Sequence, residues 1–193
     1  MNRLFPVVFI LTIVCSCGKK KRNRADEPKF FPVVAFLNTE FKKLDSAGSD
    51  FILVRSLNGN TDTTSLSKAE LKQYEKEFLA IPDLTDDETG EGYSQSSTYD
   101  TLLGKIVMTY TADDEDAELV RQHVTLSPKL QGSDQVDMIY LEKFREAGDS
   151  TVEKKLLWEG GRSFSIRTIV QKENSPAKVE NVKVAWKKTE PAN

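Results

Sequence analysis

Two segments with a helical period of apolar residues occur in the first half of the chain. From 30 to 44, apolar residues recur at steps of three and four and form one stripe on a helix. Pro32 suits the first turn of this helix, and Gly48 suits its end. From 67 to 81 a second apolar stripe has the same period. The pattern therefore predicts two helices, each with one buried face.

The second predicted helix has a well-defined start. Ser67 and Glu70 form the S-x-x-E pattern of a capping box, and Leu66 and Leu71 occupy the positions of a hydrophobic staple. Pro82 marks the end of the helix. The buried stripe is expected to hold Leu71, Tyr74, Phe78 and Ile81, and the solvated face Lys68, Lys72, Glu75, Lys76 and Glu77.

Strand-like patterns separate and follow the two helices. The apolar run 51–57 predicts a strand, Asn58-Gly59 predicts a tight hairpin, and 61–65 is interpreted as a short polar strand at an edge. Residues 83–100 are predicted to form a polar loop. From Lys105 onward the apolar period changes to two, and turn residues interrupt it at intervals that fit about six strands.

The predicted fold is therefore α+β: two N-terminal helices packed on an antiparallel meander sheet of about six to seven strands. One domain is expected over 30–190. The register is predicted at Gly160-Gly161, where a three-residue turn over 160–162 pairs Trp158 with Phe164 on the apolar face. A two-residue turn would place these two rings on opposite faces of the sheet, because a slip of one residue inverts every side chain.

The two faces of the sheet are predicted to differ. Along 135–147, Val136, Met138, Tyr140 and Phe144 are expected on the helix-packed face. The second face is interpreted as a solvent face with scattered apolar residues or, alternatively, as the binding surface for an apolar or anionic ligand. Its predicted members are Val107, Leu119, Arg121, His123, Ile139, Leu141, Lys143, Arg145, Lys155, Leu157, Arg167, Ile169, Lys183 and Lys187.

The N-terminus has the pattern of an export signal. Arg3 precedes an apolar stretch over 4–14, which is shorter than the ~20 residues needed to span a bilayer. Ser16, a small residue, precedes Cys17, and Gly18 follows it. This arrangement resembles the lipobox of bacterial lipoproteins. An ordinary cleaved signal peptide and an uncleaved anchor segment are the alternatives.

The resemblance implies cleavage between Ser16 and Cys17, with 1–16 as the signal peptide. Cys17 then becomes the first mature residue and is acylated on its sulfur and its amine. Cys15 fits less well because it would place Val14 in the small-residue position. Gly18 does not provide the aspartate associated with retention at the inner membrane, so an outer-membrane anchor is expected. Residues 17–29 form a basic tether, and membrane lipid is the expected partner through Cys17.

Composition limits the functions of the body. The 193-residue chain has 27 basic and 30 acidic residues, of which seven basic and two acidic residues lie in 1–29. The body, from residue 30 onward, therefore has 20 basic and 28 acidic residues and a net charge of −8. This charge argues against nucleic acid as a partner. No cysteine follows Cys17, so the mature body has no thiol nucleophile, internal disulfide or cysteine-based zinc site.

No motif indicates catalysis, a metal or a cofactor. His123 is the single histidine, and no G-x-S-x-G, P-loop, G-x-G-x-x-G or H-E-x-x-H occurs. We interpret His123 as an exposed strand residue. The acidic residues of 83–100 lack the ligand spacing of an EF-hand. No catalytic, cofactor-binding or metal-binding residue is therefore predicted.

Three functions fit these observations. The first is a non-catalytic envelope lipoprotein that binds other proteins or supports an envelope complex. The second is a carrier or sensor that binds a lipid or small hydrophobic ligand on a curved sheet. The third is a hydrolase without a short motif. An apolar cavity of several hundred Å³ between helices and sheet is expected for the second function, and convergent carboxylates in a cleft for the third.

Overall fold

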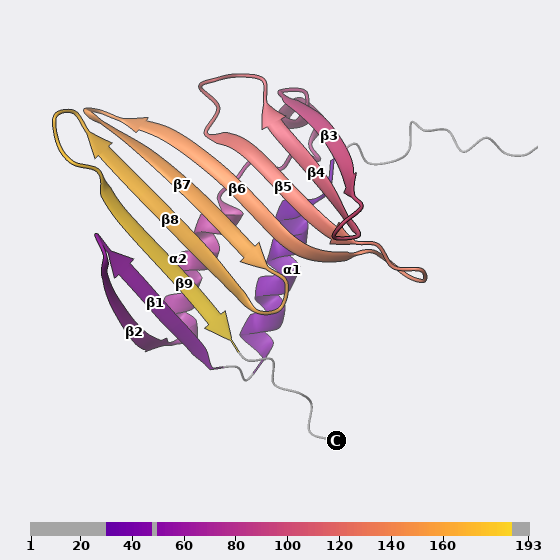
Figure 1. Ribbon diagram of the computed structural model, residues 1–193, viewed down its shortest axis with the longest axis horizontal. Helices are drawn as coiled ribbons and strands as arrows, with labels where there is room; N and C mark the ends of the chain where they lie inside the picture. The colour runs from indigo at the N-terminus through magenta and orange to yellow at the C-terminus, as the bar shows by residue number, and fades with distance from the viewer. Residues whose placement is uncertain (1–29, 48–49, 187–193) are drawn as a thin grey trace, which may run out of the picture.

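The computed structural model describes residues 30–47 and 50–186 and has an α+β fold. Nine strands form one antiparallel sheet, and α1 and α2 cover one of its faces, while the other face is open (Figure 1). The elements in chain order are α1 (Val33–Ser46), β1 (Phe51–Leu57), β2 (Asn60–Leu66), α2 (Lys68–Leu79), α3 (Asp87–Gly90), β3 (Tyr93–Asp100), β4 (Lys105–Ala112), β5 (Leu119–Ser127), β6 (Gln135–Ala147), β7 (Ser150–Glu159), β8 (Ser163–Lys172) and β9 (Lys178–Trp186).

The strand order corrects the predicted architecture. It runs β2-β1-β9-β8-β7-β6-β5-β4-β3, so β3 to β9 form a meander and the β1–β2 hairpin extends the sheet beyond β9. The sheet has nine strands rather than six to seven. The prediction of two N-terminal helices is also wrong, because β1 and β2 precede α2, and α3 follows it. The predicted tight turn at Asn58-Gly59 is confirmed, with Asn58 at φ 48° and Gly59 at φ 93°.

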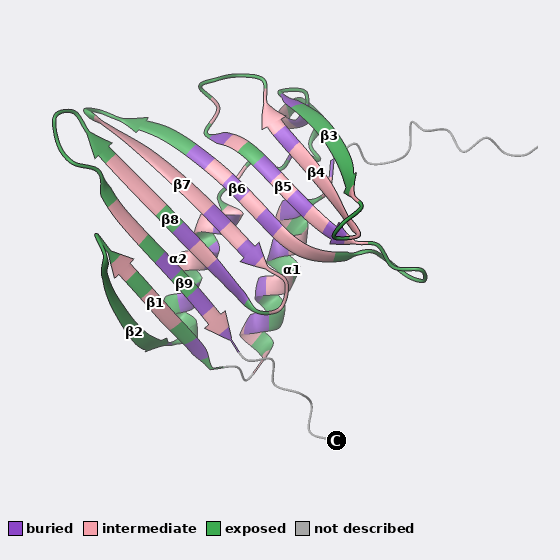
Figure 2. Cartoon of the chain, viewed as in Figure 1, coloured by how far each residue is buried: buried purple, intermediate pink, exposed green. Residues whose placement is uncertain are grey.

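The strand that the sequence did not predict is β3. Its residues lie within the 83–100 stretch that was predicted as a loop, and the same stretch also contains α3. Among the described strands, β3 pairs with β4 alone at the edge of the sheet, and six of its eight residues are exposed (Figure 2). An edge strand with little burial needs no apolar alternation, so its Ser/Thr-rich sequence resembled that of a loop.

The predicted register at the β7–β8 turn is confirmed. Trp158 pairs with Phe164, and Leu156 pairs with Ile166. The turn needs two glycines for different reasons. Gly161 has φ +69°, which favours glycine, whereas a Cβ on Gly160 would lie 2.9 Å from the carbonyl oxygen of Val136.

The predicted face of β6 is wrong beyond Val136. A register shift in the β5–β6 pairing leaves Asp137 as an extra residue, because Leu126 pairs with Val136 and Thr125 with Met138. This bulge inverts the alternation. Ile139, Leu141 and Lys143 consequently point to the helices, and Met138, Tyr140 and Phe144 lie on the open face. A second register shift lies on β5, between Leu119 and Arg121. Because of this shift, Leu119 is buried under the helices and not on the second face as predicted.

Lys143 has a structural role under the helices. The residue is 7% exposed, and its Nζ donates a hydrogen bond of 2.8 Å to the carbonyl oxygen of Ala80, the C-cap of α2. Nζ also pairs with Glu118 at 3.0 Å. A cation at the C-terminus of a helix interacts favourably with the helix dipole, so Lys143 fixes α2 to β6.

An aromatic cluster joins the helices to the middle of the sheet. Phe164 on β8 is fully buried. Its ring centroid lies 6.0 Å from that of Phe41 on α1, 5.3 Å and 6.2 Å from those of Phe78 and Tyr74 on α2, and 6.1 Å from that of Trp186 on β9. Phe164 is therefore the point at which both helices and two strands meet.

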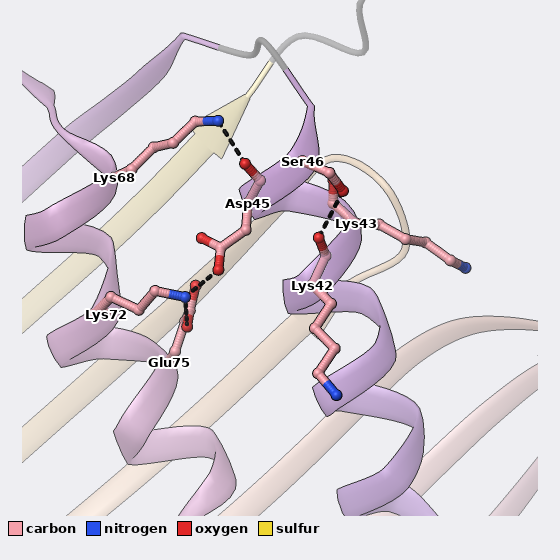
Figure 3. Close-up of polar contacts among 7 residues, drawn as sticks. All are labelled: Lys42, Lys43, Asp45, Ser46, Lys68, Lys72 and Glu75. Carbon is pink, nitrogen blue, oxygen red and sulfur yellow. Dashed lines mark hydrogen bonds and ion pairs between the residues drawn. The ribbon is translucent and has the colours of Figure 1, made fainter.

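Charged groups connect the C-terminal part of α1 to α2 (Figure 3). Lys72 pairs with Asp45 and, at 3.3 Å, with Glu75; Lys68 donates to the backbone carbonyl of Asp45. The prediction that Glu75 lies on the solvated face is wrong: the residue is 6% exposed, and its Oε1 has no hydrogen-bond partner in the described part of the chain. Burial raises the pKa of Glu75, and the hydrogen bond from Lys72 offsets only part of the rise.

We expect Glu75→Gln to stabilise the protein at neutral pH by about 1 kcal/mol. The pKa of Glu75 is higher in the folded protein than in the unfolded chain. As pH rises from the unfolded pKa to the folded pKa, ionisation of the buried carboxyl therefore lowers the free energy of unfolding. Below the ordinary glutamate pKa of about 4.3 the carboxyl is protonated in both states, and the gain disappears. Urea unfolding at pH 7 and pH 4 measures the difference. Glu91→Gln, at an exposed position, is the control, and an equal effect of both substitutions would contradict the interpretation.

Candidate functional site: a groove beside α1

A solvent-open groove runs along one side of α1. The helix contributes Phe36, Glu40, Lys43 and Leu44, and its C-cap Ala47 extends the same line. These positions recur every three or four residues and therefore share one side of the helix. The buried stripe of α1 (Val33, Leu37, Phe41 and Leu44) packs on the sheet. The groove-lining side is thus adjacent to the core-facing side, and Leu44 belongs to both.

The opposite wall is formed by one end of the sheet. The loop between β5 and β6, the first residues of β6, the β7–β8 turn and the end of β9 all contribute, and the groove has a volume of about 760 Å³. This volume lies within the usual range of small-molecule sites. The lining residues outside α1 and its C-cap are Phe31, Lys129, Ser133, Asp134, Gln135, Val136, Trp158, Gly160, Gly161 and Trp186.

Aromatic side chains give the groove an apolar interior. Phe36 stands edge-on to Trp158, with ring centroids 5.2 Å apart, and Phe31 stands edge-on to Phe36 at 5.8 Å. Trp186, the last residue of β9, also lines the groove. Trp158 and Trp186 are the two tryptophans of the whole sequence. Tryptophan fluorescence therefore reports on this groove alone.

Charged residues occupy the rim of the groove. Glu40 and Lys43 neutralise each other through an ion pair of 2.5 Å. Lys129 forms no ion pair within residues 30–47 and 50–186; Asp134, across the same loop, accepts a hydrogen bond of 3.2 Å from its backbone N–H. Its ammonium group is therefore available to an anionic group of a bound molecule.

The start of α1 is fixed to the sheet next to the groove. The backbone N–H of Phe31 donates a hydrogen bond of 3.0 Å to the hydroxyl oxygen of Tyr110 on β4. Tyr110 is fully buried, and burial raises the pKa of its hydroxyl. This contact fixes the backbone of Phe31, one of the aromatic residues that line the groove.

The predicted lipidation site cannot be compared with this groove. Ser16 and Cys17, the signal peptide 1–16 and the tether 17–29 all lie outside the described residues. Lys187, predicted on the second face, also lies outside them. Lipidation and processing therefore stay predictions.

His123 lies on the open face, away from the groove. It is half-buried rather than exposed: its Nδ1 lies 2.9 Å from the hydroxyl oxygen of Thr109, and its ring is 5.6 Å from that of Tyr140. Burial lowers the pKa of His123, the positive charge of Arg121 lowers it further, and Glu142 opposes the shift. The neighbouring cross-strand ion pairs of Arg121 and Lys155 with Glu142 make this face a polar surface rather than an apolar cavity.

A second polar cluster lies at the end of the sheet that carries the groove. Lys105 Nζ pairs with Asp137 at 2.6 Å, and the hydroxyl of Ser127 donates to the same carboxylate oxygen at 2.5 Å. Burial alone raises the pKa of Asp137, but these two hydrogen bonds and the charge of Lys105 lower it below its usual value. The carboxylate therefore stays ionised and holds the first residue of β4, the last of β5 and the bulge of β6 together.

Two further findings concern the described residues. No helix within 30–47 and 50–186 is long and apolar enough to cross a bilayer. In the same part of the chain, no three His, Asp or Glu side chains are grouped so that they could hold a metal ion.

Sequence reasoning did not identify the groove. It requires α1 to lie against the strand ends, and the strands are far from α1 in sequence. One signal was present: Phe31 and Phe36 lie off the stripe that the helical period assigns to the core. Large aromatic residues next to a core stripe indicate a second apolar contact.

Comparisons with known proteins do not assign this chain to a class. No protein-family model, no characterised protein and no solved structure matches it. The function must therefore be argued from the groove and the sequence.

Proposed function

We propose that this protein is a lipid-anchored bacterial envelope protein whose non-catalytic body binds a small hydrophobic ligand, such as a lipid, in the groove beside α1. The observation that carries the proposal is a groove of about 760 Å³ between helix and sheet, with an aromatic interior. The groove lies between helix and sheet, where a cavity is expected for a carrier, and not on the open sheet face that the sequence offered as an alternative binding surface. The polar ion-pair network on that face supports the helix side as the binding surface.

The chemistry of the lining defines the ligand class. An apolar body is favoured by contact with Phe36, Trp158 and Trp186, because burial of apolar surface contributes roughly 25 cal/mol per Å². An anionic head group can pair at the rim with the ammonium of Lys129, which forms no ion pair with any residue that the structure describes. An acyl chain with a carboxylate or phosphate combines both properties.

The anchor belongs to the same proposal. The lipobox-like sequence around Cys17 and the basic residues of 17–29 favour a membrane surface, where attraction to anionic lipids adds roughly 1 kcal/mol per charge. Acyl chains on Cys17 would hold the body beside a source of hydrophobic ligands. We propose the outer membrane as the site of the anchor.

A fluorescence titration tests the groove. Parinaric acid is a fluorescent fatty acid that accepts excitation energy from tryptophan, and both tryptophans line the groove. We expect saturable quenching of tryptophan emission as parinaric acid is added to the full chain. Ala47→Phe should weaken binding at least tenfold, because the added ring occupies the groove from the C-cap of α1.

The control is Ala147→Phe, the same substitution at an exposed position at the end of β6. It should leave the titration unchanged. Quenching that is not saturable, or that is equal in the two variants, would contradict binding in the groove.

A further inference from the structure

Three leucines are largely exposed at one end of the sheet. Leu102 and Leu103 in the β3–β4 turn are 95% and 70% exposed, and Leu130 in the β5–β6 loop is 107% exposed. Tyr99, at the base of the first turn, is 58% exposed. We call these four residues the leucine tips. Scattered single apolar residues are ordinary on protein surfaces, but neighbouring exposed apolar residues mark contact sites.

The two loops that carry the leucine tips extend from the same end of the sheet. The strands β4 and β5 are paired, with Ile106 opposite Leu126, so the turn before β4 and the loop after β5 leave neighbouring strand ends (Figures 1 and 2). The Lys105–Ser127–Asp137 cluster connects their bases. The neighbouring position of the tips is therefore a property of the folded sheet.

The acidic residues beside the leucine tips are engaged in local contacts. Asp100 Oδ1 accepts hydrogen bonds from the backbone N–H groups of Leu102 and Leu103, at 2.9 Å and 3.0 Å. Asp137 is paired with Lys105, and Asp134 accepts the N–H of Lys129. The ammonium of Lys129, next to Leu130, has no ion-pair partner in the described part of the chain. Backbone N–H groups do not neutralise the carboxylates of Asp100 and Asp134, so the exposed leucines, rather than charge, are what match a lipid surface, and Lys129 adds one cation beside them.

We propose that the leucine tips dock on the surface of the lipid bilayer and insert their side chains at the level of the head groups. Tyr99 fits this placement, because tyrosine favours the interface between membrane and water. The proposal rests on the proposed anchor at Cys17 and not on what the groove binds. It adds a consequence for the groove: Lys129, Ser133 and Asp134 line it from the loop that carries Leu130, so docking would turn this wall of the groove toward the membrane.

The chain outside the described body is long enough for this docking. The body begins beside Tyr110, because Phe31 donates its N–H to that hydroxyl. Tyr110 lies five residues along β4 from Lys105, a distance of about 17 Å. The thirteen residues from Cys17 to Lys29 span up to about 45 Å when extended. An anchor at Cys17 therefore allows the leucine tips to reach the same bilayer.

A site-specific label distinguishes docking from simple tethering. Leu130→Cys and, at the opposite end of the sheet, Ser175→Cys are introduced into the full chain, which is extracted from membranes and reconstituted into vesicles of phosphatidylethanolamine and phosphatidylglycerol. Each thiol carries an environment-sensitive fluorophore, and the chain without the added cysteine provides the background. Both positions are exposed, so neither substitution disturbs the fold.

We expect the label at 130 to shift its emission to the blue and to be quenched by brominated acyl chains at least threefold more than the label at 175. Leu102→Asp combined with Leu103→Asp should reduce that quenching toward the value at 175. Equal quenching at 130 and 175 would overturn the proposal. A blue shift of the label at 130 that appears only when an envelope protein is added, and not with vesicles alone, would also overturn the proposal. That result would identify a protein-docking surface.

Discussion

Phe164→Ala is expected to lower the free energy of unfolding by about 3–5 kcal/mol, the largest effect of any substitution considered for the body. The side chain is fully buried, and it contacts rings from α1, α2 and β9. Truncation removes apolar burial and leaves a cavity at the junction of both helices with the sheet. The free energy of unfolding of a whole domain is commonly about 5–15 kcal/mol, so this loss is a large fraction of the stability of the domain.

Urea unfolding followed by circular dichroism measures this loss. Phe144→Ala is the matched control, because Phe144 lies on the open face and is 37% exposed. We expect the control to cost less than about 1 kcal/mol. Similar losses for the two variants would contradict the burial of β8 under both helices. The comparison also tests the bulge at Asp137, because without it Phe144 would face the helices.

Cys17→Ser is expected to abolish acylation of the chain. Hydroxyl replaces the sulfur that the lipobox resemblance identifies as the acylation site, and cleavage between Ser16 and Cys17 should fail with it. Each acyl chain contributes about 0.8 kcal/mol per buried CH₂, so the loss removes most of the affinity for the membrane.

Metabolic labelling with an alkyne analogue of palmitate provides the measurement. Cys15→Ser is the matched control, because it removes the other cysteine of the chain and keeps the Ser16-Cys17-Gly18 sequence. We expect label in the wild type and in Cys15→Ser, and none in Cys17→Ser. Label that depends on Cys15 instead, or an unlabelled wild type, would contradict the lipoprotein proposal.

Local patterns predicted several elements well because the chemistry that fixes them is local. The capping box at Ser67 and Glu70 is present, with the reciprocal hydrogen bonds that define it. The pairing of Trp158 with Phe164 followed from the demand that two large apolar residues share one face. The α+β class and the six strands from β4 to β9 depended on the same kind of periodicity.

Features that depend on tertiary context were not predictable in the same way. The bulge at Asp137 inverts the faces of β6, and no nearby residue type marks it in the sequence. The strand β3 lacks an apolar pattern because the edge of the sheet gives it little burial. Glu75 is buried because α1 packs against α2, a contact that its helical position alone does not show.

The candidate site was the least predictable part of the body. Its walls come from α1, the β5–β6 loop, the β7–β8 turn and the end of β9, segments that are brought together only by the finished sheet. Phe36 and Lys129 have no motif around them in the sequence. The site is formed by residues that no motif marks, so the sequence predicted a general class of ligand but not the residues that line the groove.

Native mass spectrometry of the full chain, extracted from the envelope in which it is made, tests binding in the groove most directly. The account predicts a complex with one small hydrophobic molecule, released on collisional activation, and the loss of that complex in Ala47→Phe but not in Ala147→Phe. A wild-type chain that carries no such molecule, or a molecule retained equally by Ala47→Phe, would contradict it.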